Sequence, residues 1–269
     1  MNATQADLYR EVAGEGPPLV LVHEGICDSR MWDPQWEKFQ QTHRVVRYDL
    51  RGFGQSPLAP GRYSHPADLI ALLEELALGP ATLVGVSMGG GVSLQVAVAR
   101  PELVSALVLV GSGVRGHDWS EYVTRSWEEE ETAFERGDLD AAVEVNLRTW
   151  VDGPHRSPDE VDPEVRRKVG EMQRRALELY LEGGSDAQEE ALVLDIGDRL
   201  GEISVPALVL VGELDVPDMH AIADRLETEI PETRRATISG AAHVPSMERP
   251  DEFDELVLGF LAEVEGAQA

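Results

Sequence analysis

The hydrophobic positions of the chain fall into short continuous runs and do not alternate with polar positions. Five runs rich in Val and Leu, most of them flanked by Gly or Pro, are Leu19 to His23, Val45 to Asp49, Ala81 to Val86, Ala106 to Val110 and Ala207 to Val211. Continuous apolar runs of this length are typical of parallel strands that are buried on both faces. The pattern therefore predicts the interior strands of a parallel sheet.

Between these runs, apolar residues recur at the spacing of helices. Pro66 to Leu76 carries four leucines on one helical face, and Gly89 to Arg100 is a second predicted helix that ends before Pro101. A third predicted helix runs from Asp251 to Glu263 at the end of the chain. Alternating strands and helices indicate an α/β fold with a doubly wound, mostly parallel sheet.

The alternation stops between about Val114 and Glu202 and resumes at Val205. The stretch between them has almost no strand-like run, and it predicts four helices: Trp119 to Arg136, Leu139 to Trp150, Glu160 to Leu181 and Ala187 to Leu200. We interpret residues 114–202 as a helical insertion, and residues 1–113 with 203–269 as the core that carries it. The acidic run Glu128 to Glu131 within it is expected to be a solvated helix face.

Charge and composition limit the partners of the chain. The formal net charge is −27, which disfavours binding to nucleic acid or to an anionic membrane, since both need clustered Lys and Arg. The acidity indicates high solubility or a salt-rich or hot habitat, or else repulsion of anionic substrates. We expect a small-molecule substrate, and no pattern indicates an oligomeric state.

Cysteine content and the N-terminal segment bear on cofactors and location. Cys27 is the only cysteine and the histidines are scattered, so we expect no disulfide, no metal and no organic cofactor. Met1 to Arg10 is polar and lacks the apolar centre of a signal peptide. Runs such as Ala106 to Val110 are far shorter than the roughly 20 residues that span a bilayer. These features predict a cytoplasmic protein without a membrane partner.

The strongest chemical signal is Gly85-Val86-Ser87-Met88-Gly89. The predicted strand Ala81 to Val86 runs directly into Ser87, and a predicted helix with small residues follows it. A sharp strand-to-helix turn of this kind lifts a serine hydroxyl above the sheet, and the helix N-terminus directs backbone N–H groups at developing negative charge. We predict Ser87 as a nucleophile.

A serine hydroxyl needs a neighbouring base, and the base needs an orienting acid. His243 follows the short strand-like run Arg235 to Ile238, in a loop of small residues, and is the predicted base. Asp215 follows the run Ala207 to Val211 and is the predicted acid, because the order Ser, acid, His is the expected one. Three other carboxylates remain candidates for that role: Glu213, Asp218 and Asp118.

An oxyanion hole requires two preorganised N–H donors. The residue after the nucleophile, Met88, is expected to supply one. The other is expected from the loop after Leu19 to His23, which reads His23-Glu24-Gly25-Ile26-Cys27.

With these motifs in order, nearly the whole chain resembles the α/β-hydrolase superfamily. The resemblance rests on the His-Gly-like segment Val22 to Gly25, the D-x-R-G-x-G-x-S loop Asp49 to Ser56, the nucleophile turn Gly85 to Gly89, the acid segment Gly212 to Asp215, and His243 with Glu248 and Pro250. It implies that the insertion is a cap over the active site and that Gly25 supplies the second oxyanion N–H. Glu24 stands where the family has glycine. His23 and Asp49 are expected to be structural.

The resemblance also narrows the activity. A serine nucleophile argues against the epoxide-hydrolase and dehalogenase branches, and Val244 stands where meta-cleavage C–C hydrolases carry Trp. The segment His243 to Pro250 resembles esterases and enol-lactonases. We therefore expect a serine hydrolase of the carboxylesterase or lactonase kind, cleaving a small ester or lactone. A C–C hydrolase of the meta-cleavage type and a small-molecule receptor with an intact triad remain alternatives.

Four aromatic residues of the insertion are candidates for an apolar acyl pocket or for packing: Trp119, Trp127, Trp150 and Tyr180.

Overall fold

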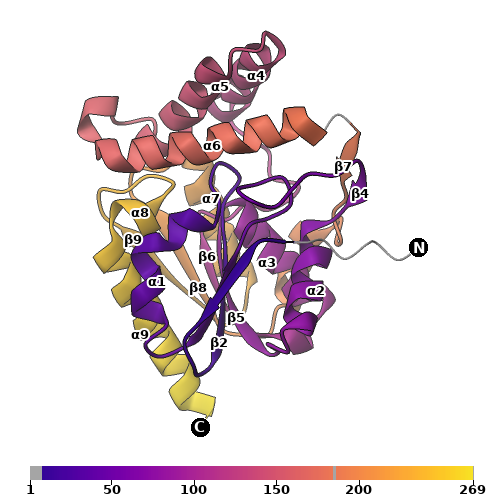
Figure 1. Cartoon of the computed structure of the whole chain (residues 1–269). Coiled ribbons are helices and arrows are strands. Elements are labelled where there is room, and N and C mark those ends of the chain that lie inside the picture. The colour runs from indigo at the N-terminus through magenta and orange to yellow at the C-terminus, as the bar shows by residue number, and fades with distance from the viewer. Residues whose placement is uncertain (1–7, 184–185, 269) are drawn as a thin grey trace.

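The computed structural model describes residues 8–183 and 186–268. A seven-stranded sheet lies at its centre, in the order β1-β3-β2-β5-β6-β8-β9 (Figure 1). Its strands are β1 (Arg10–Ala13), β2 (Pro18–Val22), β3 (Arg44–Tyr48), β5 (Ala81–Val86), β6 (Val104–Val110), β8 (Ala207–Gly212) and β9 (Thr233–Ile238). Only β1 and β3 pair antiparallel among these neighbours. The sheet is thus mostly parallel, as the sequence predicts.

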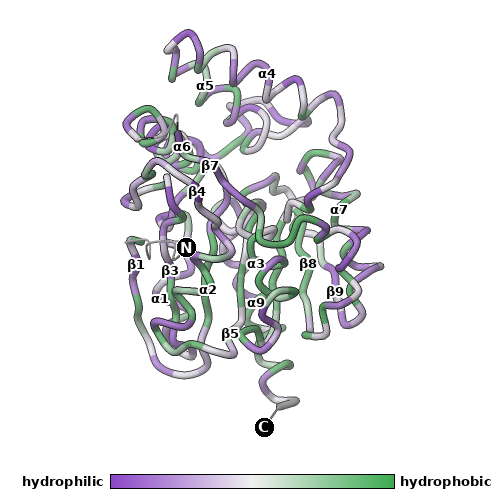
Figure 2. The backbone as a smooth tube through the Cα atoms, turned by 90° about the vertical axis from the view of Figure 1, so that its right-hand side faces the viewer, coloured by the Kyte–Doolittle hydropathy of each residue, from purple (hydrophilic) through white to green (hydrophobic). Residues whose placement is uncertain are grey.

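Helices cover both faces of the sheet. On one side lie α1 (Asp33–Phe39) and α9 (Pro250–Gln268), and on the other α2 (His65–Glu75) and α3 (Met88–Ala99) (Figure 1). Two more, α7 (Pro217–Glu229) and the short α8 (Pro245–Glu248), follow β8 and β9. In Figure 2 the interior strand β8 is hydrophobic, whereas the edge strand β9 is more polar. None of the described helices is both long and apolar enough to cross a bilayer.

The predicted interior strands agree closely with the structure. Each of the five long apolar runs coincides with a strand to within two residues at either end, and β9 contains the shorter run Arg235 to Ile238. The residues of β2, β5 and β8 are almost entirely buried, which is why both faces of these strands are apolar.

The chain leaves β2 toward β3 and returns to β5 on the other side of β2, so the winding direction of the sheet reverses between β2 and β5.

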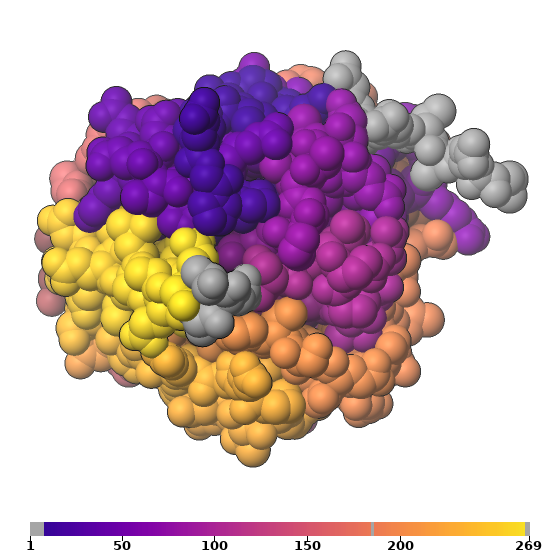
Figure 3. Space-filling model, turned by 90° about the horizontal axis from the view of Figure 1, so that it is seen from below, coloured from indigo at the N-terminus to yellow at the C-terminus, as the bar shows by residue number. Residues whose placement is uncertain are grey.

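Three helices lie beyond one end of the sheet, and we call them the helical layer. They are α4 (Glu121–Glu135), α5 (Leu139–Asn146), which continues into a π-helical turn (Leu147–Asp152), and α6 (Pro163–Gly183). Figures 1 and 2 show them stacked above the sheet. Seen from below in Figure 3, the N-terminal and C-terminal parts of the chain fill the surface and the helical layer is almost hidden.

One predicted helix is wrong. Residues Ala187 to Leu200 form a strand, β7 (Ala187–Glu189), and later a 3₁₀ turn (Ile196–Glu202). β7 pairs in parallel with β4 (Gly61–Tyr63) in a separate two-stranded sheet, and the two lie side by side in Figure 1. Downstream, the backbone N–H groups of Leu192 and Val193 donate to the Gln95 side chain at 2.9 and 3.0 Å. Because these partners come from elsewhere in the fold, the local pattern does not decide the conformation.

Both chain ends of the helical layer are tied to the rest of the fold. Before α4, the hydroxyl and N–H of Ser120 donate to the buried Asp218 at 2.6 and 2.7 Å. After α6, the β4–β7 pairing is extended by an ion pair of 2.7 Å between Arg62 and Glu190. These contacts fix the helical layer at both its entry and its exit.

Candidate active site

Ser87 occupies the turn between β5 and α3 in a strained backbone conformation. Its φ is +50° and its ψ −113°, in a region that a residue with a side chain rarely adopts and that costs about 1–3 kcal/mol. The surrounding structure holds it there, since the Ser87 N–H donates to the carbonyl of Val110 at 2.8 Å. The side chain is thereby placed at the N-terminus of α3, where the helix dipole favours negative charge.

The glycines on either side of Ser87 are required by close backbone approach. A Cβ on Gly85 would lie 2.4 Å from the carbonyl oxygen of Gly89, and one on Gly89 would lie 2.3 Å from the carbonyl oxygen of Val22. Both distances are far inside van der Waals contact. The glycine spacing of the sequence motif is therefore explained by how tightly α3 packs against β2 and β5.

His243 and Asp215 form a buried pair beside this turn. The Nδ1 atom of His243 lies 2.8 Å from Oδ2 of Asp215, and both side chains are almost fully buried. Oδ1 of Asp215 accepts the N–H of Val216 at 2.8 Å, which fixes the carboxylate. Gly111, with φ +46°, makes room for the pair, because a Cβ there would lie 3.1 Å from the imidazole.

The electrostatic environment favours a proton on His243. Burial by itself lowers the pKa of the imidazole, but the charge and hydrogen bond of Asp215, with smaller effects from Glu24 and Glu248, outweigh burial and raise the pKa of His243 above 6.5. The Nδ1 side is occupied by Asp215, so Nε2 is the nitrogen left to exchange a proton with a hydroxyl.

The other candidate acids are engaged elsewhere. Glu213 accepts the N–H of Gly240 at 2.9 Å, and Asp218 binds Ser120 before α4. Asp118 is exposed on the surface. Of the four carboxylates, Asp215 is the one that the structure brings to His243.

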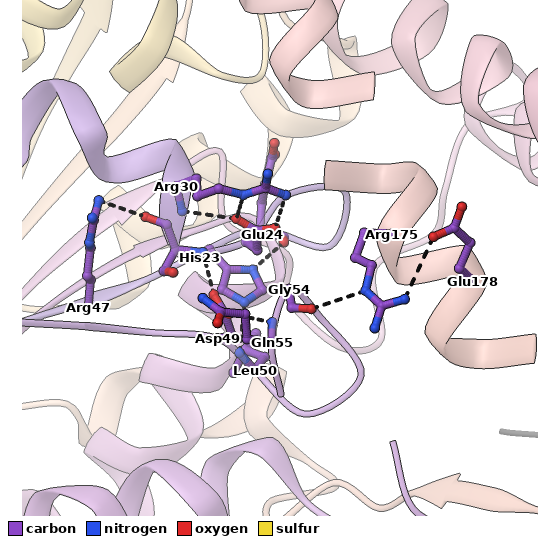
Figure 4. A network of polar contacts seen from close by, with 12 residues as sticks. His23, Glu24, Arg30, Arg47, Asp49, Leu50, Gly54, Gln55, Arg175 and Glu178 are labelled. Carbon is purple, nitrogen blue, oxygen red and sulfur yellow. Dashed lines mark hydrogen bonds and ion pairs between the residues drawn. The ribbon is translucent and has the colours of Figure 1, made fainter. Parts of the chain in front are cut away.

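His23 and Asp49 hold the loop after β2 in place, as Figure 4 shows. Nε2 of His23 accepts the N–H of Leu50 at 2.8 Å, so its Nδ1 carries the proton and donates to the carbonyl of Glu24 at 2.7 Å. Asp49 accepts the N–H of Ser29 at 2.8 Å. Burial lowers the pKa of His23, which keeps the ring neutral.

The two predicted oxyanion donors lie next to each other. Gly25 lies in the loop after β2, and Met88 begins α3 after β5, so both lie beyond the ends of the two strands between which the winding reverses. A Cβ on Gly25 would lie 3.9 Å from that of Met88. Both residues line the same cavity as Ser87 and His243.

Glu24 places an unexpected carboxyl group in the site. Its side chain is 1% exposed, Oε1 accepts the thiol of Cys27 at 3.0 Å, and Oε2 has no hydrogen-bond partner. Oε2 lies 3.7 Å from Nε2 of His243. Burial raises the pKa of Glu24 to about 7 against the opposing effects of His243 and the Cys27 thiol, so this carboxyl exchanges its proton near neutral pH.

A cavity of about 360 Å³ connects these groups with the helical layer. It is lined by Ser87, His243 and the loop after β2 on one side, and by residues of α4, α5 and α6 on the other. Of the four candidate aromatic residues, Trp119, Trp127 and Trp150 line it, whereas Tyr180 is 47% exposed and packs on Phe134. The Trp150 ring lies 4.6 Å from that of His243.

Comparison with known proteins gives the family. Residues 17–250 match the family model described as the alpha/beta hydrolase fold. The chain belongs to the α/β-hydrolase family. One of its relatives is an esterase by name. The pimeloyl-[acyl-carrier protein] methyl ester esterase of Aeromonas hydrophila is 28% identical over 258 residues, with 92% of this chain and 96% of the relative covered.

Two solved structures extend this comparison. A thermophilic esterase from Thermogutta terrifontis, with malate bound, has a TM-score of 0.78 and 28% identity, covering 96% of this chain and 93% of that one. Est816, described as an N-acyl homoserine lactone degrading enzyme, has a TM-score of 0.76 and 26% identity, covering 96% and 98%. This α/β-hydrolase is therefore similar to enzymes that act on esters and lactones.

Arg156 is a residue of this α/β-hydrolase that the sequence patterns did not single out. Its guanidinium forms an ion pair of 2.7 Å with the buried Glu248 and donates to the carbonyl of Gly240 at 3.2 Å. Glu248 in turn accepts the N–H of Ala242 at 2.8 Å. The chain between α5 and α6 thus braces the loop that carries His243, and no local motif in the sequence signals a contact of this kind.

In the described part of the chain, the carboxylates and histidines are not grouped as metal ligands. Within residues 8–183 and 186–268, no three His, Cys, Asp or Glu side chains are arranged so that they could hold a metal ion. Cys27 is buried as a free thiol, and burial together with Glu24 raises its pKa well above the usual value.

Proposed function

We propose that this protein hydrolyses a small carboxylic ester or lactone through an acyl-enzyme on Ser87. One observation carries the proposal: His243, paired with the buried Asp215 at 2.8 Å between Nδ1 and Oδ2, lines the same cavity as a serine held on a strained turn at a helix N-terminus. Nucleophile, base and orienting acid are the three groups that acyl transfer to serine requires.

In acylation, Oγ of Ser87 attacks the carbonyl carbon of the substrate while Nε2 of His243 takes the hydroxyl proton. The carbonyl oxygen becomes an oxyanion, and we assign the N–H groups of Gly25 and Met88 to stabilise it. As the tetrahedral intermediate collapses, the bond to the leaving oxygen breaks and His243 donates its proton to that oxygen. Asp215 stabilises the imidazolium formed in between.

Deacylation repeats these steps with water. His243 takes a proton from the water as the water oxygen attacks the acyl carbon, and returns it to Oγ of Ser87 when the ester bond to the serine breaks. The products are a carboxylic acid and free Ser87. For a lactone, the alcohol and the acid remain in one molecule.

We further propose that residues 114–202 act as a cap on a core formed by residues 1–113 and 203–269. The helical layer supplies the wall of the cavity opposite Ser87, with Trp127 on α4 and Trp150 after α5. A wall of this kind excludes water and selects the acyl or alcohol group of the substrate. The relatives named as an esterase and as a lactone-degrading enzyme support ester and lactone substrates.

The test is a turnover screen of aryl esters, alkyl esters and lactones with the wild type and Ser87→Ala. We expect many products per protein molecule, labelling of Ser87 by a fluorophosphonate as read by peptide mass, and a loss of about 10⁴ to 10⁶ in kcat for Ser87→Ala. Retention of activity within about tenfold in that variant would assign the chemistry to another group.

The same screen separates the two alternatives. A receptor with an intact triad would be labelled at Ser87 but would stop after about one product per molecule, leaving a stable covalent adduct. A C–C hydrolase of the meta-cleavage type would turn over vinylogous 1,5-diketones and leave simple esters nearly untouched. Either result would replace the ester and lactone assignment.

A further inference from the structure

The cavity wall formed by the helical layer ends in a polar cluster. It consists of Glu130 on α4, Asn146 on α5 and Gln173 on α6, and all three line the cavity together with Ser87. The sequence pattern predicts a solvated face for Glu128 to Glu131, and this is wrong for one member: Glu130 is half-buried, whereas its three neighbours are exposed. One helix, α4, therefore turns a single carboxylate toward the cavity.

Within this cluster, the side-chain amide N–H groups donate hydrogen bonds, and one amide oxygen is left without a donor. Nε2 of Gln173 donates to Oε1 of Glu130 at 3.3 Å, and the amide of Asn146 also donates to Glu130 and to the carbonyl of Ala142 at 3.2 Å. Oε1 of Gln173 is buried without a partner, in a side chain that is only 4% exposed. A contact between helices alone would not require an unsatisfied acceptor, which costs about 1–3 kcal/mol.

Apart from His243, the ionisable side chains that line the cavity are acidic. Among the described residues that line it are two carboxyl groups, Glu24 beside His243 and Glu130 in the layer, and no Lys or Arg. Burial raises the pKa of Glu130 in spite of its two amide partners, because no cation compensates the charge. The field of the whole chain, with its net charge of −27, adds to the repulsion of anions.

From this arrangement we propose that Glu130, Asn146 and Gln173 form a subsite for a hydrogen-bond donor of the substrate, such as a hydroxyl, amide N–H or ammonium group remote from the cleaved bond. The inference rests on the proposed function and deepens it. The apolar middle of the substrate lies along Trp119, Trp127 and Trp150, and its donor end reaches Glu130 and Oε1 of Gln173. A substrate with a carboxylate at that end is excluded.

The experiment compares esters that differ only in their terminal group. Two series of equal chain length, one varied on the acyl side and one on the alcohol side, end in methyl, hydroxyl, ammonium or carboxylate. In at least one series we expect kcat/KM for the hydroxyl and ammonium ends to exceed that for the methyl end by about tenfold or more, with the carboxylate end slowest. Equal or higher kcat/KM for the methyl end in both series would overturn the subsite.

Variants locate the effect. Gln173→Met removes the free acceptor at similar volume, and we expect it to abolish the preference for the hydroxyl end. Glu130→Gln removes the charge, and we expect it to abolish the preference for the ammonium end and to raise kcat/KM for the carboxylate end. The matched control is Glu129→Gln, one residue away on α4, where Glu129 is exposed and paired with Arg148. An equal effect of the control would also overturn the subsite.

A binding measurement separates this inference from the proposed function. Three tryptophans line the cavity, so their fluorescence reports ligand binding in Ser87→Ala, where turnover is removed. We expect the Kd values of the ester series to follow the same order, with the same losses in the Gln173→Met and Glu130→Gln backgrounds. Tight, donor-dependent binding without turnover of any ester in the wild type would refute the hydrolase and retain the subsite. Turnover of esters without any preference for a donor end would support the hydrolase and refute the subsite.

Discussion

Replacing Glu24 by Gln removes a charge that lies 3.7 Å from Nε2 of His243 and leaves the size of the side chain unchanged. An ionised Glu24 stabilises the imidazolium and so raises the pKa of His243. Catalysis as a general base needs the neutral imidazole. The substitution is therefore expected to lower the pKa of His243 and to move the acid limb of the pH profile of kcat/KM to lower pH.

The size of this shift follows from the distance. Two unit charges 3.7 Å apart interact by about 4.5 kcal/mol at an effective dielectric constant of about 20. This corresponds to roughly 3 pK units at 1.36 kcal/mol each. The pKa of Glu24 is about 7, so the carboxyl is about half ionised at neutral pH. We therefore expect the limb to move by about 1.5 pH units.

The assay is kcat/KM for an uncharged aryl ester from pH 4.5 to 9, compared between the wild type, Glu24→Gln and Glu130→Gln. Glu130 is a carboxyl of the same cavity that pairs with Gln173 on the helical layer, so its removal should leave the limb in place. A limb that stays within about 0.3 pH unit in Glu24→Gln, or that moves equally in both variants, would refute the coupling of Glu24 to His243.

Three further substitutions, the first with a matched control, test the surroundings of His243. Asp215→Asn is expected to lower kcat by about 10⁴, while Asp118→Asn should stay within about twofold in the same ester assay; the opposite order would move the acid to Asp118. Gly111→Ala puts a methyl group 3.1 Å from the imidazole of His243 at a φ of +46°. It should lower kcat/KM about tenfold and reduce the Tm, and an unchanged kcat/KM would contradict the need for glycine at this position. Arg156→Met leaves the buried Glu248 without its ion-pair partner. It should lower the free energy of unfolding, measured in urea, by about 3–5 kcal/mol, and a loss below about 1 kcal/mol would contradict the bracing role of Arg156.

The sequence predicts those parts of the fold in which the local run of apolar residues matches the burial of the element. Interior strands such as β5 and β8 lie between two helical faces, so each of their residues is apolar and the run is visible in the chain. β1, β4 and β7 have only three or four residues and mixed polarity. Their pairing depends on partners far away in sequence, which no short pattern encodes.

The same distinction applies to the candidate site. Ser87, Asp215 and His243 follow the ends of β5, β8 and β9, and the parallel direction of these strands brings the three residues to one edge of the sheet. The contact between Glu24 and His243 depends on how the loop after β2 is held by His23, and the bracing by Arg156 depends on the chain between α5 and α6. Such contacts arise from packing of distant segments, so residue type and order do not reveal them.

The ties at the two ends of the helical layer have a consequence for its motion. Asp218 holds the start of α4 through Ser120, and the β4–β7 ladder with Gln95 holds the chain after α6. A swing of the whole layer about a single hinge would break one of these attachments. Substrate entry is therefore expected to come from bending within the layer, with α4 and α5 moving relative to α6, a gating motion that opens the cavity while both of its anchors stay closed.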